Sequence, residues 1–600
     1  MLGVFVIILA FFIDSRNVGQ FQTAMATSTV NTSVTVLNTP PAWTTAAEEV
    51  AESSAANPTN SGNTMSWTAK GTDSSGDDYY LLICKTNGAA TANADAAPTC
   101  NGGGGNQWAV SGVTVSAEFA TAATTTTESF TQSNAWYAFI CDDNTILPKC
   151  NLNGTGDQQG SGNTASPFVV NHRPTFTTYA DDSPKNPGTL VTWTTTSSDP
   201  EGAEADDNVN LFVCKTNSFA TTTGTCNGGQ WCTSGLTATD PTCDFTLEDP
   251  KPDRNYAAYG FIIDQHNHGA LYTGGNLQGT DSVLTVSNVA PTITAASISL
   301  NDTDLVGPLV LTQAQGQTTG FSVKFTVADQ NSCIANSSTT PEIIHTSANV
   351  FRSDKDGIAS STAQYDPNFA YTHDYHTAYG ASGWNLVCTQ DANTCMGEGD
   401  SAVTWTCTFP LWYVASPTDA NTPWTSNTWK ASVTASDKLY ATSTEVEGST
   451  PNEVQSAMYF NVATTSIAYG GLEPGQWNTT LSIPTDLSTI GNTGLNERLY
   501  GDDMCVTYPS CTGYATSTIP VTEQKYTVTQ DALYAAGTSL QLDDGLGALL
   551  ALHIPKTTAT STPQARNTYW GINVPIAITF SGNYIGQNSL IGTVSDPADW

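Results

Sequence analysis

The hydrophobic residues of this chain gather in short runs that alternate with turn-forming segments. Runs of four to six aromatic, aliphatic and β-branched residues, such as 137–140 and 259–262, are separated by clusters of Gly, Asn, Asp and Ser. This spacing is typical of buried strands in a sandwich of two sheets. No amphipathic helical stretch interrupts the runs, so the pattern predicts an all-β fold with Trp67 and Trp193 in the cores.

The same landmarks occur twice in the same order. Trp67 lies six residues before Asp73, and Trp193 lies six residues before Asp199. Four further landmarks follow in both copies: Leu-x-x-Cys-Lys-Thr-Asn at 81–87 and 211–217, Cys-Asn-Gly-Gly at 100–103 and 226–229, Gln-Trp at 107–108 and 230–231, and Tyr-x-Phe-Ile at 137–140 and 259–262. The chain therefore contains two copies of one domain, about 133 and 117 residues long, between Pro41, Pro174 and Pro291.

An asparagine three residues before each of these prolines, namely Asn38, Asn171 and Asn288, marks the domain boundaries. We predict tandem immunoglobulin-like β-sandwich domains stapled by disulfides, followed by a C-terminal β-sandwich of a different family. The predicted segments are a signal peptide at 1–26, an N-terminal strand and linker at 27–40, immunoglobulin-like domains at 41–173, 174–290 and 291–463, and the last sandwich at 464–600. Residues 331–400 of the third domain are interpreted as inserted loops.

The N-terminus predicts export from the cell. Residues 2–13 form an apolar run of signal-peptide length, and 24–26 offer a small-x-small cleavage site. No basic residue precedes the run, so an incorrectly assigned start is the alternative interpretation. No later stretch approaches the ~20 apolar residues that a membrane span needs, and we expect no transmembrane span in the mature, extracellular chain.

The 14 cysteines lie in close local groups, which favours a disulfide framework in a secreted protein. Two predicted pairs are shared between the copies, and the others join near neighbours. The predicted pairs are Cys84–Cys100, Cys141–Cys150, Cys214–Cys226, Cys232–Cys243, Cys388–Cys395, Cys505–Cys511 and, by remainder, Cys333–Cys407. These pairings are hypotheses, because cysteine spacing alone does not fix connectivity.

The net charge of the chain indicates which classes of molecule it repels and which it attracts. The chain carries 18 Lys plus Arg against 54 Asp plus Glu, a formal charge of −36. Such a chain repels nucleic acid and anionic headgroups, and we expect no nucleic-acid partner. It can attract divalent cations.

Two acidic loops after the tryptophan strands are candidates for Ca²⁺, the one cofactor that the sequence suggests. Their carboxylates are Asp73, Asp77 and Asp78 in the first copy, and Asp199, Glu201, Asp206 and Asp207 in the second. Ca²⁺ takes six to eight oxygen ligands, which such loops supply. The alternative is a turn that uses Asp and Gly for their backbone preferences, since neither loop matches the twelve-residue calcium pattern.

Catalytic signatures are missing from the sequence. The chain has no Gly-x-Ser-x-Gly, P-loop, His-Glu-x-x-His or dinucleotide motif. His266 and His268 would share a face of a strand, but a histidine pair alone is a weak zinc signal. The first copy has Asn144 where the second has His266. We therefore expect a protein that is not an enzyme.

A strand-like segment precedes the first domain. Val34, Thr35, Val36 and Leu37 have the form of the runs that close the first two domains, at 168–171 and 284–288, yet no domain precedes them. One hypothesis is that this segment adds to a sheet edge of a neighbouring copy, giving head-to-tail assembly. The alternative is that it packs on its own domain or frays.

The Cys-Lys-Thr-Asn, Cys-Asn-Gly-Gly, Gln-Trp and 136–142 elements resemble tandem immunoglobulin-like repeats in large surface proteins of ultra-small candidate-phyla (Patescibacteria-type) bacteria. The last section, with 471–475 and 569–575, is similar to terminal sandwiches of S-layer-like proteins. The resemblance implies a structural cell-surface subunit of an S-layer, filament or matrix that assembles with copies of itself, with cell-envelope glycan as a further candidate partner. The alternative is an adhesin that binds a host or a glycan through third-domain loops, with Asp366, Tyr371, Tyr375, Tyr379 and Trp384 as candidate contacts.

Overall fold

A computed structural model describes residues 31–151, 166–202, 207–302, 307–334, 341–355, 366–372, 387–511 and 517–600. The predicted signal peptide lies outside these residues. The described chain is all-β, with short 3₁₀ turns at Gly104–Asn106, Ala295–Ser297, Ser353–Lys355, Val521–Glu523, Tyr534–Ala536 and Pro597–Asp599. It contains no helix long and apolar enough to span a membrane. It divides into two compact units at Arg173 and Pro174, a predicted boundary, and each unit is described by itself.

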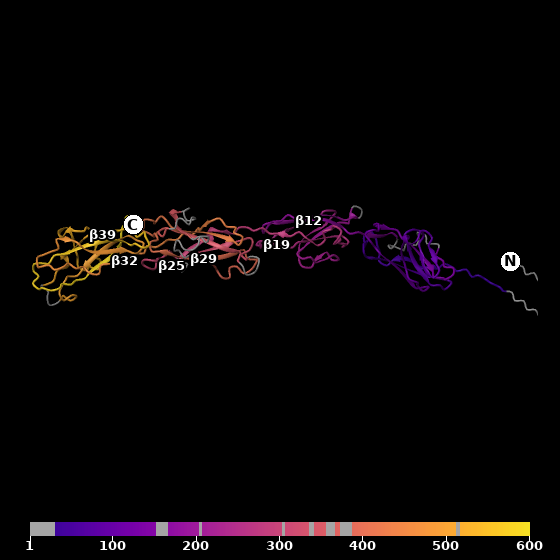
Figure 1. Cartoon of the computed structure of the whole chain (residues 1–600), viewed down its shortest axis with the longest axis horizontal. Helices are drawn as coiled ribbons and strands as arrows, with labels where there is room; N and C mark the ends of the chain where they lie inside the picture. The colour runs from indigo at the N-terminus through magenta and orange to yellow at the C-terminus, as the bar shows by residue number, and fades with distance from the viewer. Residues whose placement is uncertain are drawn as a thin grey trace, which may run out of the picture. The chain divides into compact units, whose positions relative to one another are not determined.

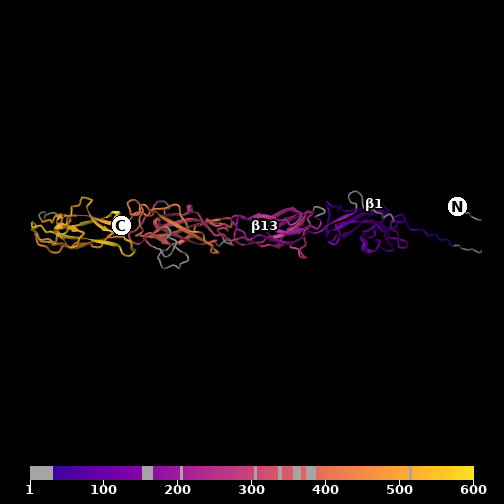
Figure 2. The same ribbon diagram turned by 90° about the horizontal axis from the view of Figure 1, so that it is seen from above.

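The first unit is an immunoglobulin-like sandwich (Figure 2). One sheet has the order β1 (Ala42–Glu49), β3 (Thr64–Thr72) and β8 (Phe119–Thr125), and the other β10 (Tyr137–Asp142), β4 (Tyr79–Cys84) and β7 (Gln107–Val110). Shorter strands are β2 (Thr59–Asn60), β5 (Thr91–Asn93), β6 (Ala96–Thr99), β9 (Ser133–Asn134) and β11 (Phe168–Asn171). Every second residue of β3 is buried, which directs the fully buried Trp67 between the sheets against Trp136 and Phe168.

The second unit begins with another sandwich (Figure 1). Its strand order repeats that of the first unit. One sheet holds β12 (Thr175–Asp181), β13 (Leu190–Ser198) and β18 (Cys243–Thr246). The other holds β17 (Gln230–Thr237), β14 (Val209–Cys214), β20 (Tyr259–Asp264) and β21 (Thr280–Asp281). Short strands are β15 (Phe219–Ala220), β16 (Thr225–Cys226), β19 (Asn255–Tyr256) and β22 (Leu284–Thr285). Trp193 of β13 is fully buried, as predicted.

The third sandwich has the same two-sheet plan with longer strands. One sheet has the order β23 (Thr292–Ile293), β25 (Gln317–Ala328), β29 (Ala402–Trp412) and β28 (Val387–Gln390), and β24 (Ser299–Asp302) also pairs with β25. The other sheet has the order β27 (Ala370–Thr372), β26 (Ile343–Arg352), β30 (Trp429–Asp437) and β31 (Val446–Glu447). The interpretation of 331–400 as inserted loops is wrong in part. This stretch contains β26, a central strand whose Ile343, Ala348 and Val350 are buried in the core.

The last sandwich differs in topology. Its five-stranded sheet runs β32 (Phe460–Val462), β34 (Ile483–Thr489), β40 (Gln564–Ile572), β36 (Gln524–Thr527) and β38 (Thr538–Ser539). A three-stranded sheet runs β39 (Ala548–Ile554), β35 (Leu495–Gly501) and β41 (Asn588–Val594), and β33 (Thr480–Leu481) pairs with β37 (Ala532–Leu533). The boundary predicted at residue 464 is a few residues late, because β32 pairs with β34 and so belongs to this sheet.

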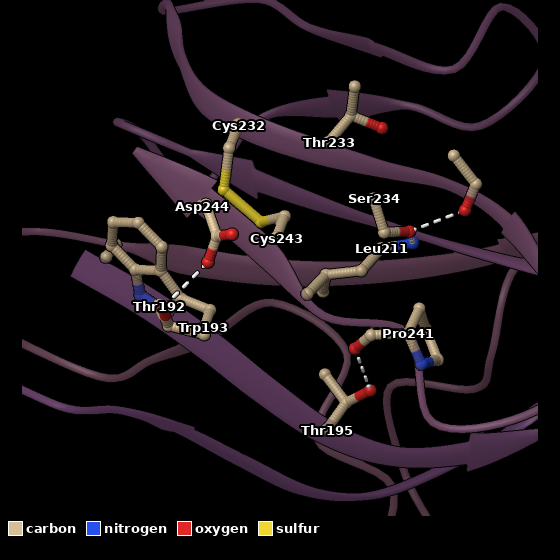
Figure 3. Close-up of a disulfide and its surroundings, with 12 residues drawn as sticks. Thr192, Trp193, Thr195, Leu211, Cys232, Thr233, Ser234, Pro241, Cys243 and Asp244 are labelled. Carbon is tan, nitrogen blue, oxygen red and sulfur yellow. Dashed lines mark hydrogen bonds between the residues drawn. A yellow bond between two sulfur atoms is a disulfide. The ribbon is translucent and has the colours of Figure 1, made fainter. Parts of the chain in front are cut away.

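All 14 cysteines form disulfides. Five predicted pairs are confirmed: Cys84–Cys100, Cys141–Cys150, Cys214–Cys226, Cys232–Cys243 and Cys505–Cys511. Figure 3 shows one of them, which joins Cys232 of β17 to Cys243 of β18 beside Trp193 and so links the two sheets of the second sandwich. Complete oxidation of the thiols is typical of an extracellular protein.

The two predictions for the third domain, Cys388–Cys395 and Cys333–Cys407, are wrong. The bonds are Cys388–Cys407 and Cys333–Cys395. The reason is register: Cys388 of β28 lies directly opposite Cys407 of β29, so their side chains meet across the pair of strands. The nearest cysteine in sequence, Cys395, lies in the connection between these strands and bonds to Cys333, which follows β25.

The N-terminal segment forms no strand. Residues 31–41 have no regular secondary structure, and Val34, Val36 and Leu37 are 86%, 83% and 69% exposed. Thr35 is exposed as well. The segment therefore presents apolar side chains to solvent.

Candidate metal centre

Three carboxylates converge at one end of the second sandwich. Asp199 directly follows β13, Glu201 lies two residues later, and Asp207 precedes β14. One ligand oxygen of each lies within 4.8 Å of the others. All three side chains are buried, with 7%, 6% and 1% of their surface exposed. Burial of three like charges together requires a compensating proton or cation.

Local hydrogen bonds fix this geometry. Asp199 Oδ1 accepts the backbone N–H of Glu201 at 2.8 Å, which folds the loop back immediately after the strand. The Gly202 N–H donates to the Asp199 carbonyl at 3.2 Å. Asp207 Oδ1 accepts the N–H of Gln265, from the loop after β20, at 3.3 Å. The centre is thus built from the loops that follow β13 and β20.

The pKa values of the aspartates reflect their burial close to one another. Burial, a hydrogen bond with Glu201 and repulsion by Asp207 raise the pKa of Asp199 to about 9. Burial also raises the pKa of Asp207, although His266, whose Nε2 lies 3.8 Å from Asp207 Oδ2, opposes that rise. Without a cation, the cluster must hold a proton at neutral pH. A set of carboxylate oxygens is the ligand chemistry that Ca²⁺ prefers.

The structure therefore brings together three of the four predicted residues in this loop, and Asp206 lies outside the described residues. The predicted first-domain set does not form such a group within the described part of the chain. Asp77 Oδ2 accepts from Asn144 Nδ2 at 3.0 Å, and Asp78 Oδ1 accepts from the Ser116 N–H at 3.3 Å, so these two hold neighbouring loops. Asp73 is buried, and its Oδ1 accepts the Ser75 N–H at 2.6 Å.

Sequence reasoning missed Asp264, the last residue of β20. Its Oδ1 accepts the N–H groups of His266 and His268, each at 2.8 Å, which places His266 beside Asp207. A signal was present in the repeat itself: Asp264 ends the 259–264 strand as Asp142 ends the 137–142 strand.

The candidate sugar-binding residues of the third domain are partly structural. Tyr371 is fully buried, and its hydroxyl donates to the Pro367 carbonyl at 2.6 Å, so it cannot stack on a sugar. Asp366 Oδ1 accepts the Asn368 N–H at 2.8 Å and caps its own turn. Tyr375, Tyr379 and Trp384 lie outside the described residues.

Comparisons with known proteins add little to this picture. No protein-family model matches the chain, and no curated protein does. Among solved structures, a marsupial T cell receptor aligns over 65% of this chain and 96% of its own, with 9% sequence identity and a TM-score of 0.24. The immunoglobulin-like assignment rests on the strand order and cores described above.

Proposed function

We propose that this chain is a structural protein of the cell exterior, which assembles with copies of itself into a surface layer or an extracellular filament and catalyses no reaction. The observation that carries the proposal is the segment 34–37, whose alternating apolar side chains are exposed and make no strand pairing within the described chain. An exposed β-forming segment of this kind is suited to pair as an added strand with the exposed edge of a β-sheet.

The last sandwich offers a matching acceptor. A groove of ≈ 1010 Å³ is lined by Ile572 of β40, Gln524 of β36, and Asn588 and Leu590 of β41. The strand β41 is an edge of its three-stranded sheet, so its outer backbone groups are available for pairing. Docking of residues 34–37 from one copy beside β41 of the next would generate an open head-to-tail polymer.

Assembly of the full chain tests the proposal. We expect wild-type protein to form ordered assemblies by negative-stain electron microscopy and sedimentation, and the V34D/V36D double variant to remain monomeric because buried carboxylates oppose docking. The V113D/V115D variant is a matched control. Val113 and Val115 are 51% and 61% exposed on the first sandwich, outside the docking segment, so this variant should assemble like wild type. A monomeric wild type, or unimpaired V34D/V36D assembly, would contradict the proposal.

Tyr371 is one of the candidate sugar contacts of the adhesin alternative, and it cannot contact a sugar because it is buried in the core of the third sandwich. No described residue favours this alternative.

A further inference from the structure

The first three sandwiches carry the same pair of aspartates at the same strand ends. One directly follows the longest strand of the first sheet: Asp73 after β3, Asp199 after β13 and Asp329 after β25. The other is the last residue of a long strand in the opposite sheet: Asp142 of β10, Asp264 of β20 and Asp437 of β30. In every case Oδ1 accepts the N–H two residues further on, from Ser75, Glu201, Asn331, Asn144, His266 and Leu439 respectively, at 2.6–3.2 Å.

In the first and third sandwiches a linker asparagine is hydrogen-bonded to the second aspartate of the pair. Asn38 Nδ2 donates to Asp142 Oδ2 at 2.8 Å, and Asn288 Nδ2 donates to Asp437 Oδ2, also at 2.8 Å. These asparagines are the residues that mark the domain boundaries in the sequence. The chain entering each of these two sandwiches is therefore bound to the same strand end through the same atoms.

Several acceptors in these two clusters are buried without any hydrogen-bond donor in the described chain. In the first sandwich they are Asn38 Oδ1 and Asp73 Oδ2, on side chains that are 7% and 8% exposed. In the third they are Asn288 Oδ1, Asp329 Oδ2 and Glu342 Oε1, with Asp329 2% and Glu342 0% exposed. Buried acceptors are nearly always satisfied, so their recurrence at equivalent positions calls for a ligand.

Carboxylates outnumber the cations around these oxygens, although Lys149 Nζ donates to the Asn38 carbonyl in the first sandwich. In the third sandwich Asp329 lies near Glu342, Asp437 and Asp253, the last of which belongs to the second sandwich. Lys438 compensates part of this charge, since its Nζ lies 2.6 Å from Asp253 Oδ1 and 2.8 Å from Glu342 Oε2. Burial, then repulsion from Glu342, Asp437 and Asp253, raises the pKa of Asp329 to about 7. In the first sandwich, burial and the nearby Asp73 raise the pKa of Asp142.

We propose that Ca²⁺ binds at both positions, held by the linker asparagine and the two strand-end aspartates: Asn38, Asp73 and Asp142 in the first sandwich, and Asn288, Asp329 and Asp437 in the third. The ligands are all oxygens on separate loops. This suits the large, adaptable coordination shell of Ca²⁺ better than the strict octahedron of Mg²⁺.

The site in the third sandwich would also fasten the second sandwich to the third. Asp253 and Lys251 belong to the second, and Asn331 Nδ2 donates to the carbonyls of Lys251 (3.2 Å) and Ser287 (2.8 Å). Asn331 Oδ1 accepts the Val289 N–H at 2.5 Å. A cation held between Asn288, Asp329 and Asp437 would lock this linker to the turn that contains Asn331.

Calcium binding to the full-length chain tests the inference. After removal of metal with a chelator, equilibrium dialysis against ⁴⁵Ca²⁺ gives the stoichiometry, and calorimetry with CaCl₂ or with KCl of equal ionic strength gives the melting temperatures. We expect CaCl₂ alone to raise the melting transitions, and the variants D73N and D329N each to bind one Ca²⁺ fewer than wild type. The control D543N removes one exposed charge from a turn aspartate of the last sandwich and should bind as wild type does.

The KCl arm is needed because a chain of charge −36 is stabilised by any screening salt. Equal shifts with KCl and CaCl₂, or undiminished binding by D73N and D329N, would overturn the inference. Removal of a buried charge predicts that D329N melts higher than wild type in the absence of calcium. For this variant the number of Ca²⁺ ions bound in dialysis therefore decides the test, and the melting temperature does not. The assay reads single chains and is independent of whether they assemble.

Discussion

Two glutamates are buried in different units, and their surroundings differ. Glu49 accepts the Trp136 Nε1–H at 2.9 Å through one oxygen and the Ser53 N–H at 2.8 Å through the other. Glu497 is fully buried and accepts from Thr568 Oγ1 at 2.6 Å, while its Oε1 has no donor in the described chain. Burial raises the pKa of each to about 7. Glu497 is therefore the less well compensated acid.

The variant E497Q should show a stability gain that depends on pH. Because the folded pKa of Glu497 is raised from 4.5 to about 7, the folded state holds an extra proton between these values, and stability falls as pH rises through that window. Each pKa unit corresponds to about 1.4 kcal/mol, so the ionised carboxylate costs about 3 kcal/mol above pH 7. Calorimetry should show E497Q equal to wild type at pH 4 and more stable at pH 8. The exposed Glu473→Gln is the control, and a gain independent of pH would refute this account.

At the scale of elements, disulfides act at different places in the sandwiches. Cys232–Cys243 joins strands of opposite sheets, whereas Cys388–Cys407 joins neighbours within one sheet. Cys333–Cys395 closes a longer loop, with a sequence separation of 62 residues, and ties the segment after β25 to the connection between β28 and β29. Loops of that length give the larger stabilisation in the chain-entropy model.

The variant C388S/C407S decides between the two connectivities of the third sandwich. With the observed pairing, its non-reducing tryptic digest should contain a Cys333 peptide linked to a Cys395 peptide, because that bond is untouched. With the pairing inferred from spacing, both cysteines would be free thiols. Alkylation before digestion followed by mass spectrometry distinguishes a linked peptide pair from two alkylated peptides.

At the scale of the whole molecule, the chain is modular. The first unit has its own core around Trp67, and the second has separate cores around Trp193 and around Phe325 and Val433. The third and last sandwiches share polar contacts. The buried Asn492 donates to the carbonyls of Ala415 (3.1 Å) and Gln455 (3.0 Å).

This modularity predicts how fragments behave. A chain of residues 31–173 should fold alone, and its melting transition should match one transition of the full chain to within the few degrees that loss of a linker causes. A chain of residues 174–600 should reproduce the remainder. Differential scanning calorimetry of the three proteins checks this, and a fragment 31–173 that fails to unfold cooperatively would contradict it.

The sequence by itself determined the all-β class, the duplicated domain and five of seven disulfides, because strand periodicity, turn residues and short cysteine spacings are local properties. It also marked Asp199, Glu201 and Asp207 as candidate ligands. Only the tertiary structure decided the partners of Cys388 and Cys333, the role of β26 and the meeting of Asn288 with Asp437. These features depend on strand register and on contacts between loops from distant parts of the chain. The local spacing of residues reveals neither the register nor such contacts.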